Sequence, residues 1–148
     1  MYQHDHSGLV DVLTEQVQCV DAMLLALERE NHALLENDAE TLNAAGADKN
    51  RLLETLESLE HERQGLAAND ASFEQLIADD VDAKSSWQQL VERLEECRRR
   101  NQRNGALVNA RQEQIAKMLI ILRGVQTEVY DSHGQKPAAP AARSLGSA

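Results

Sequence analysis

Core-type positions recur every three or four residues along the second half of this chain, which is the period of one face of an α-helix in a coiled-coil-like bundle. The series covers residues 87–129 and no proline interrupts it. Its positions are Trp87, Leu90, Leu94, Cys97, Asn101, Asn104, Val108, Arg111, Ile115, Met118, Leu122, Val125 and Val129. The pattern predicts a long helix at about residues 86–131, with Ser85 or Ser86 as its N-cap.

The same alternation predicts two earlier helices, at about residues 7–36 and 38–68. The core face of the first reads Val10, Leu13, Val17, Val20, Leu24, Leu27, Asn31 and Leu34. The face of the second is shifted by one residue, and the break falls at Asn37. Asn37 and Glu40 together resemble a capping pair that opens a new helix. A sharp turn between two antiparallel helices explains the shift, and a single kinked helix is the alternative.

The remaining segments complete the predicted fold. In the connector at residues 69–84, Phe73, Leu76 and Ile77 are spaced to form a short amphipathic helix that caps one end of the bundle. Residues 135–148 contain both prolines and few bulky apolar residues, which is typical of a disordered tail. We therefore expect an all-α fold. It would be a single helical domain at residues 1–134, built as an antiparallel, coiled-coil-like bundle of three main helices.

Composition supports long packed helices. Aromatic residues make up only 3% of the 148 residues, so the core must consist mainly of Leu, Val, Ile and Ala. No apolar run is long enough to cross a membrane, and the N-terminus lacks the pattern of a signal peptide. We expect a cytoplasmic protein without membrane insertion.

Cys19 and Cys97 read as small buried hydrophobic residues, since two cysteines form neither a disulfide framework nor a structural zinc site.

The net charge of −10 hides a basic segment at residues 98–124, which has seven basic residues and one acidic residue. Arg98, Arg99, Arg100 and Arg103 form its densest part. We interpret them as a solvated helix face that pairs with the acidic first and second helices. Nucleic-acid binding is a minor alternative, because the chain is acidic overall and no aromatic residues are interleaved with the arginines. No nucleic-acid partner is expected.

Three polar residues, Asn101, Asn104 and Arg111, fall on the core face of the long helix, and Asn31 falls on the face of the first. A buried amide without a hydrogen-bond partner costs about 1–3 kcal/mol. One interpretation is a polar layer that fixes the register of the helices. The other is a weak point in the helix, which Gly105 weakens further, so that the segment after it is free to move.

The run Met118-Leu119-Ile120-Ile121-Leu122 is too apolar for one face of a helix. It fits a helix buried on two sides or a homodimer seam, and it equally fits a face that receives an amphipathic helix of a partner. Tyr130 follows the series just before the stop signal at Gly134. One interpretation is an exposed docking anchor, and the other is a tyrosine that is packed at the helix end.

Catalytic and cofactor-binding patterns are missing from the sequence. We find no Gly-rich phosphate loop, no nucleophile elbow and no paired acid and base. His4 and His6 alternate near the N-terminus, but two ligands make a poor metal site. We expect no enzyme activity, no cofactor and no bound metal.

Two short motifs resemble the FlgN family of flagellar export chaperones. The first is N-x-x-N-G-x-L, in which Asn101, Asn104 and Gly105 take part, and the second is Y-D-x-x-G, at residues 130–134. The long first helix and the leucine-rich stretch RLLETLESLE of the second also fit. The resemblance covers about residues 9–134.

The resemblance implies a cytoplasmic chaperone of the flagellar type III export system. Such a chaperone binds the hook-filament junction proteins FlgK and FlgL, prevents their premature assembly and delivers them to the export gate. The implied cargo face comprises Ile115, Met118, Leu119, Leu122, Val125 and Val129. Tyr130 matches a tyrosine that docks on the export gate protein FlhA. The alternative is a structural coiled-coil homo-oligomer or a general helical interaction adaptor.

Overall fold

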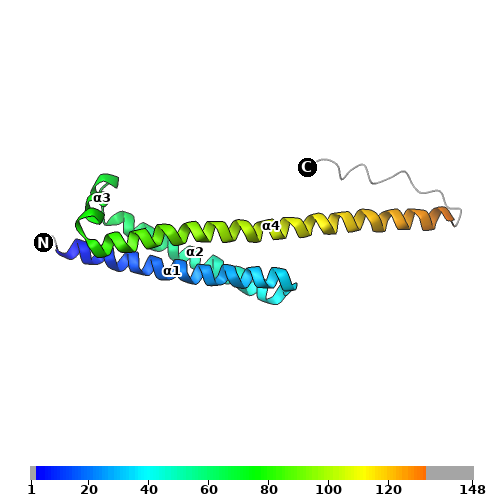
Figure 1. Ribbon diagram of the computed structural model, residues 1–148, viewed down its shortest axis with the longest axis horizontal. Coiled ribbons are helices and arrows are strands. Elements are labelled where there is room, and N and C mark those ends of the chain that lie inside the picture. The colour runs from blue at the N-terminus through cyan, green and yellow to red at the C-terminus, as the bar shows by residue number, and fades with distance from the viewer. Residues whose placement is uncertain (1–2, 133–148) are drawn as a thin grey trace. The chain divides into compact units, whose positions relative to one another are not determined.

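The computed structural model describes the backbone of residues 3–132 and the side chains of residues 8–124. Its helices are α1 (Gln3–Glu36), α2 (Ala39–Gly65), α3 (Asp70–Asp79) and α4 (Val81–Ser132) (Figure 1). The predicted all-α fold is confirmed. The chain divides into two compact units, Met1–Leu107 and Val108–Ala148. The single domain at residues 1–134 stays a prediction, and the tail at residues 135–148 lies outside the described residues.

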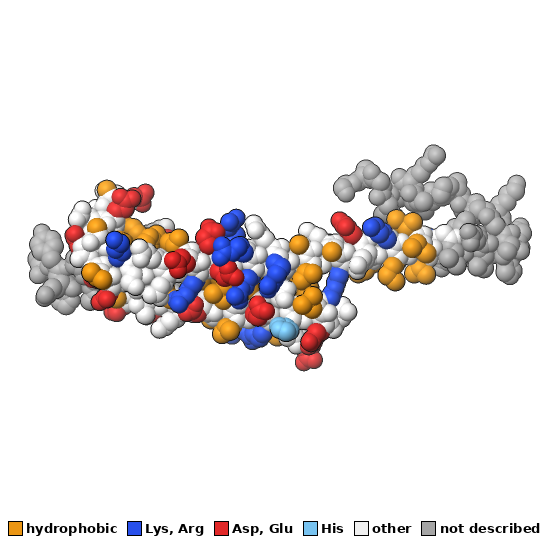
Figure 2. All heavy atoms as spheres, viewed as in Figure 1, with side chains coloured by type: hydrophobic (Ala, Val, Ile, Leu, Met, Phe, Trp, Pro, Cys, Tyr) orange, Lys and Arg blue, Asp and Glu red, His pale blue; other side chains and the backbone are white. Residues whose placement is uncertain are grey.

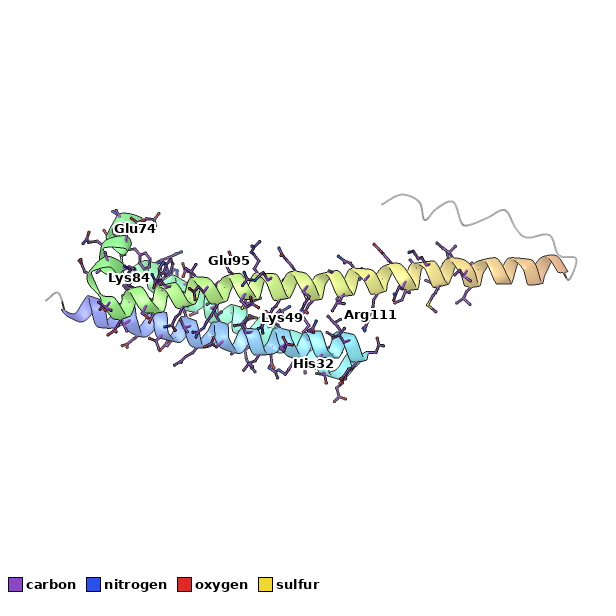
Figure 3. The ribbon with its side chains drawn as sticks, viewed as in Figure 1. His32, Lys49, Glu74, Lys84, Glu95 and Arg111 are labelled. Carbon is purple, nitrogen blue, oxygen red and sulfur yellow. The ribbon has the colours of Figure 1, made fainter. Side chains whose placement is uncertain are left out.

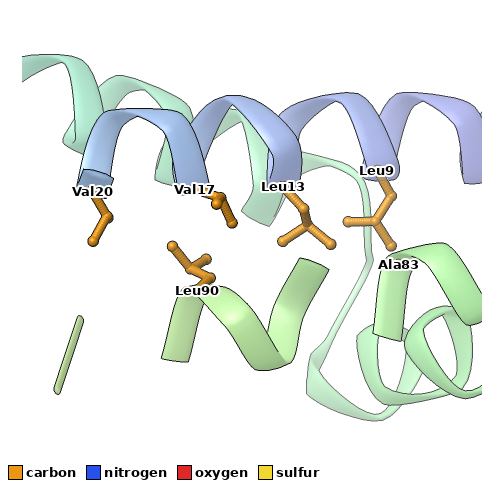
Figure 4. Close-up of a cluster of buried hydrophobic side chains, with 6 residues drawn as sticks. All are labelled: Leu9, Leu13, Val17, Val20, Ala83 and Leu90. Atoms are coloured by element: carbon orange, nitrogen blue, oxygen red, sulfur yellow. The ribbon is translucent and has the colours of Figure 1, made fainter. Parts of the chain in front are cut away.

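In the first unit, α1 packs against both α2 and the first half of α4. Leu9, Leu13, Val17 and Val20 of α1 form a buried cluster with Ala83 and Leu90 of α4 (Figure 4). The amide of Gln16 bonds Glu60 and the carboxylate of Glu30 bonds Lys49, so α1 and α2 are antiparallel. α4 runs parallel to α1, as the bonds from Cys97 to Val20 and from Asn104 to Leu27 show. The predicted antiparallel arrangement of the first two helices is confirmed, and the alternative of a single kinked helix is wrong.

The turn between α1 and α2 depends on two adjacent residues: Asn37 ends α1, and Asp38 begins α2. Asn37 adopts a positive φ of 57°, which ends α1 in the left-handed conformation common at helix C-termini. The N–H of Asp38 then bonds the carbonyl of Ala33 at 3.0 Å. The Asp38 carboxylate accepts from the N–H of Thr41 at 3.1 Å. The predicted capping pair of Asn37 and Glu40 is therefore wrong: Asp38 is the N-cap of α2, and Asn37 closes the helix before it.

The long helix α4 begins at Val81, earlier than the predicted start near residue 86. The carboxylate of Asp80 accepts hydrogen bonds from the N–H groups of Asp82 and Ala83 at 2.9 and 3.2 Å. Asp80 therefore caps the helix, and the predicted caps Ser85 and Ser86 lie inside it. An aspartate directly before the first turn satisfies N–H groups that would otherwise lack a partner.

The short helix α3 confirms the predicted amphipathic helix in the connector. The Phe73 ring meets the Trp87 ring of α4 edge to face, with their centroids 5.0 Å apart. The Arg63 guanidinium of α2 lies over both rings, 4.4 Å from the centroid of Phe73 and 5.3 Å from that of Trp87. Arg63 is also ion-paired with Glu60, and it holds the pKa of the Glu60 carboxyl below its usual range. These contacts join α2, α3 and α4 at one end of the bundle.

Candidate functional site

The second unit carries an exposed run of large apolar side chains on α4. Their exposed fractions lie between 48% and 67%, for Ile115, Met118, Leu119, Ile120, Ile121 and Leu122. Hydrophobic side chains gather on this part of α4 in the surface view (Figure 2). Contiguous exposed apolar groups of this kind mark sites of interaction with proteins or other apolar partners.

These side chains do not surround the helix evenly. At about 100° per residue, Ile121, Met118, Leu122, Ile115 and Leu119 lie within an arc of about 160°. We call these five residues the apolar face. Ile120 falls outside the arc, on the side that also carries Glu113 and Lys117. The segment is therefore amphipathic, and its geometry suits contact with another amphipathic helix.

The structure describes the side chains of some of the predicted cargo residues and not of others. Ile115, Met118, Leu119 and Leu122 lie on the apolar face, and their role in cargo binding stays a prediction. Ile121 also belongs to the apolar face, although the resemblance did not include it; the run of five consecutive apolar residues was the signal that pointed there. The side chains of Val125, Val129 and Tyr130 lie outside the described residues.

A polar layer crosses the bundle of the first unit near the end of its part of α4. Asn104 is only 2% exposed, and its Nδ2 donates to the carbonyl of Leu27 and to the carboxylate of Glu30, both at 2.9 Å. Its Oδ1 accepts from Nδ2 of Asn31 at 3.1 Å. Every polar group of the Asn104 side chain thus contacts α1. This geometry supports the interpretation of a polar layer that fixes register, because a shift of α4 along α1 would separate the partners.

Lys49 extends the polar layer to α2. Figure 3 labels Lys49. Its Nζ donates to both carboxylate oxygens of Glu30, at 3.2 and 3.1 Å, and to Oδ1 of Asn101 at 2.8 Å. Asn101 was predicted on the core face, but it is exposed and only its side-chain oxygen reaches the layer.

Gly105 has no close neighbour: an added Cβ would meet no described atom within 4 Å. Gly105 thus lowers the helix propensity of this stretch without serving a close approach.

The basic run at the start of the basic segment is paired with acidic side chains. Arg98 pairs with Glu95 and Arg99 with Glu96, both on α4. Arg100 and Arg103 reach Glu28 on α1, each at 3.5 Å. Arg99 and Arg100 hold the pKa of the Glu96 carboxyl below its usual range. The arrangement fits a solvated, ion-paired face that holds α4 to the acidic α1, rather than a surface that awaits nucleic acid.

A groove of about 200 Å³ lies between the three long helices of the first unit. Its apolar lining comes from all three: Val20, Met23 and Leu27 of α1, Leu53 and Leu56 of α2, and Leu94 and Cys97 of α4. Lys49, Arg98 and Asn101 complete it. Leu94 was predicted as a core residue but is 40% exposed, because α2 and α4 pack on α1 without closing over it at this level.

Cys97 is half-buried in the wall of the groove, while Cys19 is buried as predicted. Burial raises the pKa of the Cys97 thiol to about 11. At about pH 8 its thiolate fraction should be more than about 100-fold below that of an unfolded cysteine. We expect iodoacetamide to alkylate Cys97 correspondingly slowly in the folded protein, with a rate that rises with pH up to about 11.

Mass spectrometry of the Cys97 peptide, alkylated with and without urea, measures this ratio. A folded-state rate within about tenfold of the unfolded one would show that the thiol is not shielded.

Other kinds of site find no support in the described part of the chain. No group of three or more metal-ligating side chains gathers among the described residues, and His4 and His6 lie outside the described side chains. None of the described helices is long and apolar enough to cross a membrane.

Comparison with known proteins gives the family. The model of the family described as FlgN protein matches residues 1–138, a range that includes both the polar layer and the apolar face. Neither a curated protein nor a solved structure matches the chain. Proteins of the matched family are export chaperones of the flagellum and have no enzyme activity. The chain therefore belongs to the FlgN family of flagellar export chaperones.

Proposed function

We propose that this chaperone acts in the cytoplasm, where it binds the terminal helices of the hook-filament junction proteins FlgK and FlgL. It keeps these helices from premature assembly and delivers them to the export gate. The observation that carries the proposal is the apolar face, which is exposed on a helix in a chain of the FlgN family. A chaperone of this kind needs binding alone, with no catalytic step.

The apolar face supplies the driving force for cargo binding. A terminal helix that assembles into a filament has an apolar stripe of its own, and burial of two such stripes against each other removes both from water. Full burial of one leucine side chain contributes about 1.5–3 kcal/mol. The basic side chains Arg111 and Lys117 and the acidic Glu113 lie in the same stretch and are available for contacts at the rim of the interface.

Charged residues on the apolar face should abolish cargo binding. Leu119→Glu and Leu122→Glu together should weaken binding of the FlgK terminal helix at least about 100-fold, because apolar contacts are lost and two carboxylates must be desolvated. Ile120→Glu is the control: it introduces one carboxylate next to Leu119 but outside the apolar face, and should change binding less than about threefold. Isothermal titration calorimetry measures the affinities, and circular dichroism checks that helicity is retained.

If the double variant binds as tightly as the unmodified protein, the apolar face is not the cargo site. Equal losses in the double variant and in Ile120→Glu would point instead to a general effect of charge on the helix.

We extend the proposed cargo face to Val125 and Val129, and we assign docking on the gate protein FlhA to Tyr130. These assignments rest on the family's motif at residues 130–134 and on the heptad-like spacing of the sequence. Tyr130→Ala should retain FlgK binding and lose FlhA binding, because the two sites use different side chains. Retention of FlhA binding in this variant would remove Tyr130 from the docking site.

A further inference from the structure

The groove of the first unit is a second apolar surface that the proposed cargo face leaves unused. Leu53 and Leu94 stand on its opposite walls, on α2 and α4, and are 46% and 40% exposed. Its volume of about 200 Å³ exceeds the roughly 150 Å³ of an engineered protein cavity that admits a benzene molecule. The groove therefore has room for large aliphatic side chains presented by a helix, such as a pair spaced three or four residues apart.

We propose that the groove receives the apolar face of a second copy of this chain when no cargo is bound. The inference rests on the proposed function, because the face that enters the groove is the one we assign to cargo. The groove of one copy would thus cover the apolar face of another, and cargo would have to displace the covering copy.

Charge favours a second copy as the occupant. The helix α2 lines the groove with Lys49, Leu53 and Leu56, and over its whole length it carries six acidic and three basic side chains. Residues 108–124, which contain the apolar face, carry three basic side chains (Arg111, Lys117, Arg123) and one acidic side chain, Glu113. The net charge of α2 is therefore −3 and that of residues 108–124 is +2. These opposite net charges attract each other, which favours this pairing over contact between like-charged segments.

The two cations in the groove do not oppose a basic occupant strongly. Lys49 is ion-paired with Glu30 at 3.1 Å, and Arg98 with Glu95 at 3.0 Å. Glu57 lies on α2 one turn beyond Leu53 and outside the lining of the groove; it is exposed, and no described side chain forms an ion pair with it. Glu57 is therefore available to an arriving basic side chain.

The apolar face is also suited in shape. Met118 and Leu122 are four residues apart on it, and Ile115 and Leu119 repeat that spacing, so either pair points to the same side of the helix. The groove offers aliphatic side chains from three helices to such a pair. The resulting contact is heterologous: the face of one copy meets the groove of another, unlike a seam in which two identical faces meet.

Sedimentation velocity of the full chain without cargo tests the inference. The unmodified protein should self-associate in a concentration-dependent manner, and Leu53→Glu, Leu94→Glu and Leu119→Glu should each sediment as monomers. Leu25→Glu is the matched control, because Leu25 is 67% exposed on α1 but does not line the groove. It should associate like the unmodified chain. Circular dichroism confirms that every variant is folded, and the two groove variants lie on different helices.

Mixing the variants gives the sharpest readout. Leu94→Glu keeps an intact face and Leu119→Glu keeps an intact groove, so an equimolar mixture of these two monomers should form a heterodimer. Three outcomes overturn the inference: an unmodified chain that stays monomeric up to about 1 mM, a Leu94→Glu variant that associates normally, or a mixture that stays monomeric. The second of these would assign the association to a seam of identical faces.

The cargo helix separates this inference from the proposed function. Leu94→Glu should bind the FlgK terminal helix at least as tightly as the unmodified chain does. If it loses cargo binding, the groove belongs to the cargo and the inference fails. If Leu119→Glu binds cargo normally, the proposed function fails, whatever the sedimentation shows.

Discussion

Asn104→Asp is expected to lower the free energy of unfolding by about 3–5 kcal/mol at neutral pH. The substitution replaces a donor with an acceptor at a side chain that is only 2% exposed. The amide nitrogen that it removes lies 2.9 Å from the Glu30 carboxylate and 2.9 Å from the carbonyl of Leu27. A second carboxylate there would face two acceptors, one of them negatively charged. Urea unfolding followed by circular dichroism measures the loss.

The matched control is the same substitution three residues earlier. The side-chain oxygen of Asn101 already accepts a bond from Lys49 at 2.8 Å, and the residue is exposed. Asn101→Asp should therefore be neutral or should stabilise the fold by less than about 1 kcal/mol. Equal losses in the two variants would contradict the polar layer, since its claim is that only Asn104 is buried among acceptors.

The destabilisation by Asn104→Asp should depend on pH in a defined direction. Burial and the neighbouring Glu30 carboxylate raise the pKa of the introduced carboxyl in the folded state. The folded state then binds a proton more readily than the unfolded state does. The loss in free energy of unfolding is therefore complete above the raised pKa, and it becomes smaller as the pH falls through that pKa. Unfolding curves at about pH 8 and about pH 5 should show the smaller loss at the lower pH.

Leu13→Ala should destabilise the first unit by about 3 kcal/mol. Leu13 is fully buried in the cluster that joins α1 to α4, so the truncation removes apolar contacts and leaves a cavity among Leu9, Val17 and Leu90. Leu25→Ala on the same helix is the control, because Leu25 is 67% exposed, and its loss should stay below about 0.5 kcal/mol. Similar losses for both would show that α1 does not bury its predicted face against α4.

The helical period predicted the main packing correctly but underestimated the burial of α1. Leu13, Val17, Val20 and Leu27 are buried as expected. A single core face did not anticipate a second set of buried residues: Leu9, Val12, Gln16, Met23 and Ala26. The physical reason is that α1 lies against two helices, so its apolar surface is wider than one face. The apolar content of α1 was the available signal.

Helix ends were harder to predict than helix faces. The shift of frame at Asn37 indicated the turn, but asparagine is common both as an N-cap and in the left-handed conformation, so its task was assigned wrongly. The start of α4 was placed too late because the apolar series begins at Trp87, whereas the first turn is set by the hydrogen bonds of Asp80. Capping depends on backbone geometry that periodicity does not report.

Only part of the candidate site could be predicted, because contacts between helices depend on a register that periodicity does not report. The excess of apolar residues at 118–122 marked the apolar face without knowledge of any partner. Asn31 and Asn104 were each placed on a core face, but their hydrogen bond required the register between α1 and α4, which lie far apart in sequence. The groove was not predicted from the sequence, because Leu94 fits the core series of the long helix as well as it fits a groove wall.

The most direct test of the central claim is hydrogen–deuterium exchange of the full chain with and without the FlgK terminal helix. At a concentration so low that the cargo-free chain is monomeric, we predict that cargo slows amide exchange at residues 112–124, which contain the apolar face, and leaves exchange in α2 unchanged, because burial protects a helix that was previously open to water. Protection confined to α1 and α2, with no change at residues 112–124, would contradict the assignment of the apolar face to cargo.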